Sequence, residues 1–570
     1  MRVVATAGHV DHGKSSLVRL LTGTDPDRWE EERRRGMTID LGFAHTVLPD
    51  GEAISIIDVP GHVRFLRNML AGVGAVDACI FVVAATEGWK PQSEEHLRIL
   101  SLLGVQHGVV AMTMRDLVDD DTVVLRELEV ADHLAGSFLD GAPIVAVSNT
   151  TRAGLDDLRG ELARLVQLTP AAADSGRPRL WIDRVFSARG SGTVVTGTLT
   201  GGPVSVDDHL TAGGHPVRIR GIQSHDAPVE RIGPGNRVAL NLAGVDHEHL
   251  RRGDAVVRAE QWRPTRRVDA SLHVLASLGH EVTRRGAWTV HIGSGEFPAS
   301  VRVLGSEAIP PGGTGNVRIH LHAEIPLVLG DRYVLRESGR DETVGGGEVL
   351  DVAPVMPASR ARPDRSIDRV VAEHGVIDVD DLEALTGERR TATVGRFVVA
   401  PGALESIRSR LGRSVADAGP IGLDIATLDE VDRAALATLE GTVVDNGRAR
   451  FAVDDDPFAH HPLLAVFEEG GVAPPDPTGL DRAVVRELVR RNLLVERDGL
   501  LFHPSAIDAA ALTAARLLVE SPGGFTLSRF REALGNTRKH AVPIAAELDA
   551  RGITRRRDDL RIAGPRLPTT

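Results

Sequence analysis

The sequence predicts a multidomain protein: an α/β nucleotide-binding domain, then two antiparallel β-barrels, then a series of winged-helix units. Three observations predict this order. A strand, a glycine-rich loop and a helix follow one another at the start of the chain. Short strands with glycine turns dominate the middle, from about residue 178 to 355. Short helices alternate with hydrophobic strands from about residue 358 onward.

The composition is that of a globular protein with several cores, at 570 residues, 42% hydrophobic and 25% charged. No apolar run reaches the roughly 18 residues that span a bilayer, and the opening does not resemble a signal peptide. The single cysteine, Cys79, lies in an apolar run and is expected to be a packed strand residue. A lone cysteine suits a reducing compartment, so we expect a cytoplasmic protein with no membrane contact. The net charge of −13 argues only weakly against nucleic acid, because local fields matter more than the sum.

The glycine-rich loop at Gly8–Ser15 fits the pattern G-x-x-x-x-G-K-[ST] between a strand and a helix. Its glycines let backbone N–H groups surround a phosphate, and the helix N-terminus adds partial positive charge. Lys14 is expected to reach the β- and γ-phosphates, and the Ser15 hydroxyl to bind Mg²⁺. The expected nucleotide-binding residues of the loop are Gly8, His9, Val10, Asp11, His12, Gly13, Lys14, Ser15 and Ser16.

Two segments that follow resemble the switches of the translational GTPases, which implies an α/β P-loop GTPase domain over residues 1–172. Thr38 matches the threonine that coordinates Mg²⁺ in the triphosphate state. In Asp58-Val-Pro-Gly61-His62, the resemblance implies that Asp58 holds Mg²⁺ through water and that Gly61 senses the γ-phosphate. It also implies that His62 is the catalytic residue, which positions the attacking water.

The base-binding motif is only partly typical of that family. Thr113-Met114-Arg-Asp116 stands where GTPases usually carry [NT]-K-x-D, and Ser148 opens a partial match to the loop that meets guanine O6. Asp116 can accept both N–H groups on the guanine edge, which selects guanine over adenine. Met114 replaces the usual lysine and can supply its packing on the base without its charge. The motifs therefore predict a site for GTP and GDP through Thr113, Asp116 and Ser148.

The middle of the chain predicts two antiparallel β-barrels, at 175–262 and 266–355. The resemblance to translational GTPases implies that they are of the tRNA-binding type. The expected strands include Leu180–Phe186, Gly192–Gly197, His215–Ile222 and Asn236–Leu242. A GTPase domain followed by two barrels is typical of elongation factors that deliver aminoacyl-tRNA.

Several segments are similar to the selenocysteine-specific elongation factors (SelB type), the longest being Asp331–Asp351. The resemblance implies that Asp183, Arg184 and Arg237 line a selenocysteyl pocket, with the arginines on the selenolate and Asp183 orienting one of them. The chemistry agrees, because a selenol is largely anionic at neutral pH and a selective pocket should present fixed cations. The alternative is that these three residues form ordinary ion pairs on the barrel surface.

The last part of the chain predicts four small winged-helix units, three within 358–506 and one at 507–570. The final unit is the clearest, with helices expected at 510–520, 527–534 and 537–551 and a two-stranded wing at 552–562. It holds eleven Lys and Arg against seven Asp and Glu, a net charge of +4. The resemblance implies that it grips an mRNA hairpin, and the alternative is a solvated basic face. The expected RNA-binding residues are Arg538, Lys539 and His540 at a helix start, and Arg555, Arg556 and Arg557 in the wing.

Together these features predict a GTP-dependent elongation factor that delivers selenocysteyl-tRNA to the ribosome at UGA codons marked by an mRNA hairpin. The expected cofactors are GTP or GDP and Mg²⁺, and we expect a monomer. Two alternatives stay open. One is another translational GTPase, such as a general tRNA carrier or an initiation-type subunit. The other is a nucleotide-switched winged-helix RNA-binding regulator.

Overall fold

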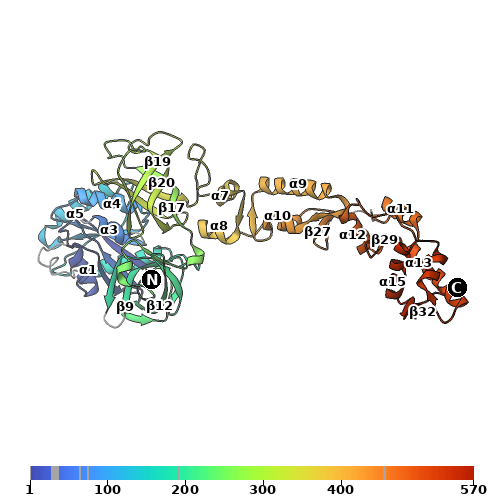
Figure 1. Cartoon of the computed structure of the whole chain (residues 1–570). Helices are drawn as coiled ribbons and strands as arrows, with labels where there is room; N and C mark the ends of the chain where they lie inside the picture. Colours follow the sequence, from blue (N-terminus) through green and yellow to red (C-terminus); the bar gives the residue numbers. More distant parts are fainter. Residues whose placement is uncertain are drawn as a thin grey trace. The chain divides into compact units, whose positions relative to one another are not determined.

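The computed structural model describes residues 2–26, 38–62, 66–73, 76–188, 192–452 and 458–569. The chain divides into two compact units, Met1–Ala400 and Pro401–Thr570. The first unit holds the nucleotide domain, both barrels and one winged-helix unit (Figure 1). Among the described helices, none is both long enough and apolar enough to cross a bilayer.

The nucleotide domain is built on a six-stranded sheet in the order β2-β3-β1-β4-β5-β6. Only β2 runs antiparallel to its neighbour. The order reverses beside β1, and this switch point is where α/β sheets bind ligands at the carboxyl ends of their strands. The strands are β1 (Arg2–Gly8), β2 (Gly42–Val47), β3 (Ala53–Asp58), β4 (Ala78–Ala84), β5 (Gly108–Thr113) and β6 (Ile144–Ala146).

Helices cover both faces of this sheet because its central strands are continuously apolar. Helices α1 (Lys14–Thr22) and α6 (Leu155–Leu168) pack on one face. Helices α3 (Leu66–Val73), α4 (Pro91–Leu102) and α5 (Asp120–Leu134) cover the other face (Figure 1). The packed role expected for Cys79 is confirmed, since the thiol is fully buried in β4 and burial raises its pKa.

The first barrel closes through six antiparallel strands in the order β11-β16-β7-β9-β15-β12, with β8 and β13 attached. The strand expected at Leu180–Phe186 is wrong as a single element. It is interrupted at Ile182 and Asp183, because Ile182 N–H donates to Asp254 O while Asp183 N–H turns to Thr196 O. The strands are β7 (Arg179–Trp181), β8 (Arg184–Ala188), β9 (Gly192–Thr200), β11 (His209–Ala212), β12 (His215–Ser224), β13 (Ala227–Val229), β15 (Asn236–Ala243) and β16 (Ala255–Val257), with a short pair β10 (Val204–Ser205) and β14 (Arg231–Ile232) beside them.

The second barrel is also closed and six-stranded, in the order β17-β20-β19-β18-β21-β22. Alternate residues of β19 are buried and exposed, which is the pattern of a strand with one face on a core. Its strands are β17 (Pro264–Val274), β18 (Trp288–Ile292), β19 (Gly295–Leu304), β20 (Thr314–Pro326), β21 (Arg332–Glu337) and β22 (Glu342–Asp351).

A first winged-helix unit packs directly on the barrels. It consists of α7 (Ile367–His374), β23 (Val376–Asp378), α8 (Val379–Thr386) and β24 (Phe397–Val399). Arg177, before the first barrel strand, donates to Ala384 O of α8 at 3.0 Å, and Arg263 donates to Asp381 at 2.6 Å. These contacts group the unit with the barrels rather than with the rest of the C-terminal arm.

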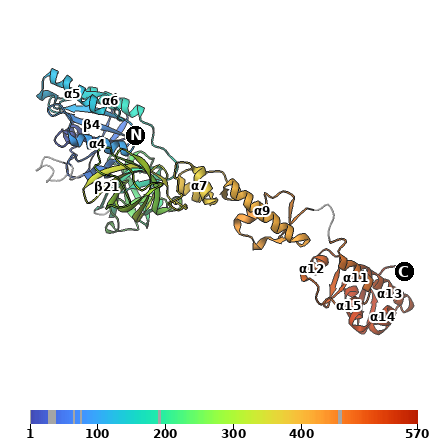
Figure 2. The ribbon, with the colours of Figure 1, turned by 90° about the horizontal axis from the view of Figure 1, so that it is seen from above.

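The second compact unit contains three further groups of short helices and strands. The helices of its last two groups lie together near the C-terminus (Figure 2). Helix α13 begins at Pro504, earlier than the expected Ala510, because His503 caps the helix and proline suits its first turn. The groups are α9 (Pro401–Asp417), β25 (Leu423–Asp424), α10 (Glu430–Leu436), β26 (Thr442–Asp445) and β27 (Arg448–Phe451); α11 (Pro462–Gly470), α12 (Arg482–Arg490), β28 (Val495–Arg497) and β29 (Leu500–Phe502); and α13 (Pro504–Glu520), β30 (Phe525–Thr526), α14 (Leu527–Leu534), α15 (Arg538–Ala550), β31 (Thr554–Arg557) and β32 (Leu560–Ala563).

Candidate functional site: a phosphate-binding loop and a paired-arginine pocket

The glycine-rich loop lies between β1 and α1, at the carboxyl edge of the sheet. Gly13 sits before the helix with φ of 79°, a left-handed conformation that favours glycine. Gly8 leaves no room for a side chain, since a Cβ there would lie 2.1 Å from the carbonyl oxygen of Val82. The loop backbone is therefore shaped by its two glycines, as the motif requires.

The lysine of the loop is buried and held by backbone oxygens. Lys14 Nζ donates to His9 O at 2.7 Å and to Gly8 O at 3.1 Å. Burial lowers the pKa of Lys14 to about 8, although the nearby carboxylate of Asp58 opposes the shift. A buried ammonium whose pKa is lowered by burial is stabilised by any anion that reaches it, so the loop suits a phosphate.

Residues of α4 hold the loop from outside, which the motif did not predict. Gly8 N–H donates to His96 Nδ1 at 3.0 Å, and Val10 N–H donates to the Gln92 side chain at 3.1 Å. Burial lowers the pKa of His96 to about 3, so this imidazole is neutral and accepts a hydrogen bond. No spacing in the sequence joins a helix residue to a loop more than eighty positions away.

Three side chains with oxygen atoms that could bind a metal ion lie near Lys14: Ser15, Thr38 and Asp58. The hydroxyls of Ser15 and Thr38 lie 2.7 Å apart, and Thr38 is buried. Asp58 is fully buried at the end of β3 and accepts a hydrogen bond from the Thr6 hydroxyl at 2.7 Å. Hydroxyl and carboxylate oxygens are the ligands that Mg²⁺ prefers, so this donor set fits the expected ion.

The loop after β3 comes up against the phosphate-binding loop. A Cβ on Gly61 would lie 2.4 Å from Lys14 Nζ and 2.7 Å from Val10 N, so the backbone of Gly61 approaches both. His62 follows at once and is half-buried. The structure therefore brings Gly61 to the loop, and His62 is the last described residue before residues 63–65.

The two base-binding segments also meet at this edge. The Thr113 hydroxyl donates to His12 O at 2.7 Å, and the Asn149 amide donates to Gly13 O at 3.2 Å. Asp116 lies in a short helical turn and is exposed, while Ser148 is buried and accepts from Thr151 N–H at 2.9 Å. Thr113, an expected residue, and Asn149, which was not expected, thus link the two segments directly to the phosphate-binding loop.

The three residues expected to form a cargo pocket come together where the first barrel meets β2. Arg237 pairs with both carboxylate oxygens of Asp183, at 2.6 and 3.0 Å, and the Thr196 hydroxyl donates to the same carboxylate at 2.6 Å. The guanidinium carbon of Arg237 lies 3.3 Å from the ring centroid of Phe43, and that of Arg184 lies 4.5 Å from it. The ring of Phe43 therefore makes a cation–π contact with both guanidinium groups, a role that no sequence signal indicated.

The two arginines differ in their other partners. Only Arg237 is paired with Asp183, and its side chain is 11% exposed. Arg184 instead donates to the carbonyl oxygen of Leu41 and lies 3.9 Å from the carboxylate of Asp40. Beside Arg237 is a cavity of about 170 Å³, which also borders His225.

The residues expected to bind RNA occupy two surfaces of the last winged-helix unit. Arg538, Lys539 and His540 open α15, and Lys539 Nζ lies 3.6 Å from the carboxylate of Asp476 in the preceding unit. Arg555, Arg556 and Arg557 form β31, and all three are exposed. The structure places both sets in one unit.

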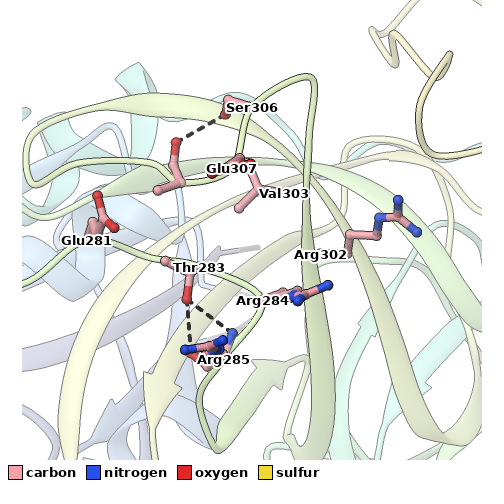
Figure 3. Close-up of a pocket in the computed structure, with 9 residues that line it drawn as sticks. Glu281, Thr283, Arg284, Arg285, Arg302, Val303, Ser306 and Glu307 are labelled. Atoms are coloured by element: carbon pink, nitrogen blue, oxygen red, sulfur yellow. Dashed lines mark hydrogen bonds between the residues drawn. The ribbon is translucent and has the colours of Figure 1, made fainter.

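An open groove that borders described residues lies on the second barrel (Figure 3). It has a volume of about 720 Å³ and is lined by Arg284, Arg285 and Arg302, with Glu281 and Glu307 among the other lining residues. Among the described residues, none of these three arginines has a carboxylate within ion-pairing distance. The groove thus offers cationic side chains that are not neutralised within the described part of the chain.

The fold and the loop define a class: a P-loop nucleotide-binding protein whose sheet is followed by two closed barrels and winged-helix units. The model of the elongation factor Tu GTP binding domain matches residues 1–170, and the model of the elongation factor SelB winged helix matches residues 516–563. Elongation factor Tu 2 of Streptomyces avermitilis is 33% identical over 385 residues, which are 61% of this chain and 96% of that protein. The chain belongs to the elongation-factor family of translational GTPases.

Within that family, selenocysteine-specific elongation factors are similar to this chain. The protein of Desulfomicrobium baculatum is 40% identical over 61% of this chain, and that of Escherichia coli is 35% identical over 67%. The chain covers only 55% and 62% of these two relatives, which is less than two thirds of their length. A crystal structure of bacterial EF-Sec, a selenocysteine-specific elongation factor, shares the fold, with a TM-score of 0.74, 24% identity and 99% of both chains covered.

Proposed function

We propose that this chain is a GTP-hydrolysing elongation factor that carries selenocysteyl-tRNA to the ribosome and is recruited by an mRNA hairpin. The observation that carries the proposal is the Arg237–Asp183 pair on Phe43, which lies between the first barrel and the nucleotide domain. The relatives named for selenocysteine support this assignment over a general tRNA carrier.

GTP and GDP bind in this proposal with their phosphates on the loop from Gly8 to Ser16. Lys14 neutralises the β- and γ-phosphates, and Asp116 accepts from the guanine edge. Ser15, Thr38 and Asp58 would hold Mg²⁺, directly or through water, and the ion would offset the phosphate charge when bound. The 2.7 Å separation of the Ser15 and Thr38 hydroxyls supports this assignment.

In hydrolysis, Gly61 and His62 of the loop after β3 have different tasks. Gly61 offers a backbone N–H at the γ-phosphate, which a side chain at this position would obstruct. His62 orients the attacking water, as the residue at this place does in the family. Loss of the γ-phosphate then releases Thr38, and the cargo with it.

Selection of the cargo depends on charge. A selenolate is an anion at neutral pH, whereas the hydroxyl of serine is neutral. Arg237 is almost buried, so an anion that reaches it gains a charge-assisted hydrogen bond in a partly dry site. Asp183 fixes the guanidinium plane and keeps this cation from being buried alone.

Recruitment depends on the basic final unit, which is linked covalently to the carrier. The residues at the start of α15 and in β31 contact the RNA hairpin, which is recognised by shape and by exposed loop bases. Linkage raises the concentration of the carrier at the marked codon without any new contact. The arginines of the groove in Figure 3 fit the phosphodiester backbone of a bound tRNA. The protein acts as a cytoplasmic monomer.

The deciding experiment is a binding titration of the protein loaded with a non-hydrolysable GTP analogue. The ligands are selenocysteyl-tRNA, seryl-tRNA on the same tRNA body, and an ordinary aminoacyl-tRNA. We expect selenocysteyl-tRNA to bind at least about tenfold tighter than seryl-tRNA, because one charge-assisted hydrogen bond is worth about 1.5–3 kcal/mol. Equal binding of all three would identify a general carrier instead. Failure to bind any of the three would favour a nucleotide-switched regulator.

A further inference from the structure

We propose that Arg252 is a positioning residue that couples the nucleotide site to the arginine pair beside Phe43. Arg252 lies on the first barrel, between the turn at His247–His249 and β16. Its guanidinium donates to the Asn68 side chain of α3 at 2.7 Å and to Asp40 at 3.3 Å. One barrel residue thus contacts two separate segments of the nucleotide domain.

These two segments begin beside the residues assigned to sense the nucleotide. Asp40 comes two positions after Thr38, and α3 follows the loop that carries Gly61 and His62. The segments are also joined to each other, since the Asn68 amide donates to Ile39 O at 2.7 Å. Arg252 therefore contacts both segments that adjoin the nucleotide site, the one after Thr38 and the one after His62. We call this set of contacts, between Arg252, Asn68 and residues 39–40, the junction.

The same junction reaches the cation pocket within a few residues. Arg184 donates to Leu41 O and lies near Asp40, the residue that Arg252 contacts. Phe43, two positions beyond Leu41, carries the guanidinium of Arg237 on its ring. A shift of residues 39–41 therefore moves the supports of both arginines, and this inference rests on the cargo pocket of the proposed function.

The chemistry of arginine explains why one side chain can do this. Its planar fork presents several N–H donors in fixed directions, so it can serve two acceptors at once, which a lysine cannot do in the same way. The Arg252 side chain is 31% exposed and Asp40 is 29% exposed, so their ion pair adds little to overall stability. Its removal should weaken the coupling between sites far more than the fold.

The test measures how strongly the nucleotide controls cargo binding. The dissociation constant of selenocysteyl-tRNA is determined with a GTP analogue and with GDP, and their ratio is compared between the unchanged protein and Arg252→Met. We expect the ratio to fall by about tenfold in the variant, within the usual range of coupling energies, while GTP affinity changes little. Hydrogen exchange at residues 39–44 should rise in the variant bound to the GTP analogue.

Arg258→Met is the matched control, because Arg258 pairs with Asp208 at 3.3 Å within the same barrel and is 29% exposed. This control should keep the ratio of the unchanged protein, and Arg252→Lys should recover only part of it. An unchanged ratio in Arg252→Met overturns the inference and leaves the proposed function standing. If that variant does not fold, Asn68→Ala breaks the same junction from α3 and decides by the same ratio. Failure of the unchanged protein to bind any aminoacyl-tRNA overturns the proposed function and the inference together.

Discussion

Lys14 has a protonation state that depends on its ligand. Its pKa of about 8 in the ligand-free protein results from burial, and bound phosphates must raise it again. Between about pH 8 and 10, nucleotide binding should therefore take up as much as one proton, and affinity should fall as the pH rises. The last phosphate ionisation lies near pH 6 and does not contribute, whereas guanine N1 ionises in the upper part of this range, so the contribution of Lys14 is measured near pH 8.

Calorimetric titration of GTP in buffers of different ionisation enthalpy measures this uptake. Lys90→Met is the control, since Lys90 is the other lysine of the nucleotide domain and pairs with Glu87 at 3.0 Å on the surface. The variant should take up protons like the unchanged protein. Binding near pH 8 with no proton uptake would contradict the expected rise of the Lys14 pKa.

Gly61 is a position where the structure leaves no room for a side chain. In Gly61→Ala, the new Cβ would lie within 3 Å of Lys14 Nζ and Val10 N, so the loop must shift. We expect GTP turnover to fall at least about tenfold, equivalent to about 1.4 kcal/mol in the barrier. Single-turnover hydrolysis in the presence of ribosomes measures this.

Gly160→Ala is the matched control, because a Cβ at this position of α6 meets no atom within 4 Å. This substitution should leave turnover unchanged and raise the free energy of unfolding by about 0.5–1 kcal/mol through helix propensity. If both variants hydrolyse GTP at the same rate, Gly61 has no special place at the γ-phosphate.

Arg237 should distinguish two cargoes that differ in a single atom. Arg237→Ala removes the buried cation, so we expect affinity for selenocysteyl-tRNA to fall by roughly tenfold to a hundredfold. Affinity for seryl-tRNA on the same tRNA body should fall much less, because a neutral hydroxyl gains little from the charge. Arg218→Ala, which removes an exposed ion pair of the same barrel, serves as the control. Equal losses for the two cargoes would refute the pocket.

At the scale of elements, α15 is the helix to which the proposed function assigns RNA recognition. Its first turn carries Arg538, Lys539 and His540, next to a groove of about 640 Å³ that also borders Asp476. The ion pair between Lys539 and Asp476 is exposed and weak, so a phosphate can replace the carboxylate as the partner of the lysine.

Lys539→Ala should therefore weaken binding of the hairpin RNA and reduce the slope of log affinity against log salt by about one. Filter binding at several salt concentrations measures both quantities. Arg516→Ala is the control, since Arg516 is exposed on α13 of the same unit and should affect binding less. An unchanged affinity and slope in Lys539→Ala would leave the basic turn as a solvated surface.

At the scale of the whole molecule, the boundary after Ala400 separates two sets of hydrophobic cores. The apolar clusters of the nucleotide domain and the first barrel lie before it, and those of the last winged-helix units lie after it. We expect residues 1–400 and 401–570 to fold separately, the first binding GTP and the second binding hairpin RNA. Calorimetry should show that the melting transitions of the two fragments add up to those of the full chain. A single cooperative transition in the full chain would contradict this independence.

Local sequence patterns predicted much of the fold, because apolar runs, glycine loops and the order of helices are visible in neighbouring residues. Consecutive residues record the apolar runs of β4 and β5, the loop before α1 and the helix–helix–wing order of the last unit, although both strands pair with partners far along the chain. The family models and the shared fold of EF-Sec agree with the architecture that these patterns predict. Element ends were less certain, as α13 and the interrupted strand at Ile182 show, because caps and partner strands decide them.

The sequence by itself determined the phosphate-binding loop, whose chemistry depends on consecutive residues such as Gly13, Lys14 and Ser15. Only the tertiary structure decided that Asp183 pairs with Arg237, that Phe43 supports two guanidiniums and that His96 holds the loop. It also decided that the first winged-helix unit packs on the barrels, through Arg177. The physical reason is distance along the chain: a motif records neighbours within a few residues, whereas these contacts join side chains that only folding brings together.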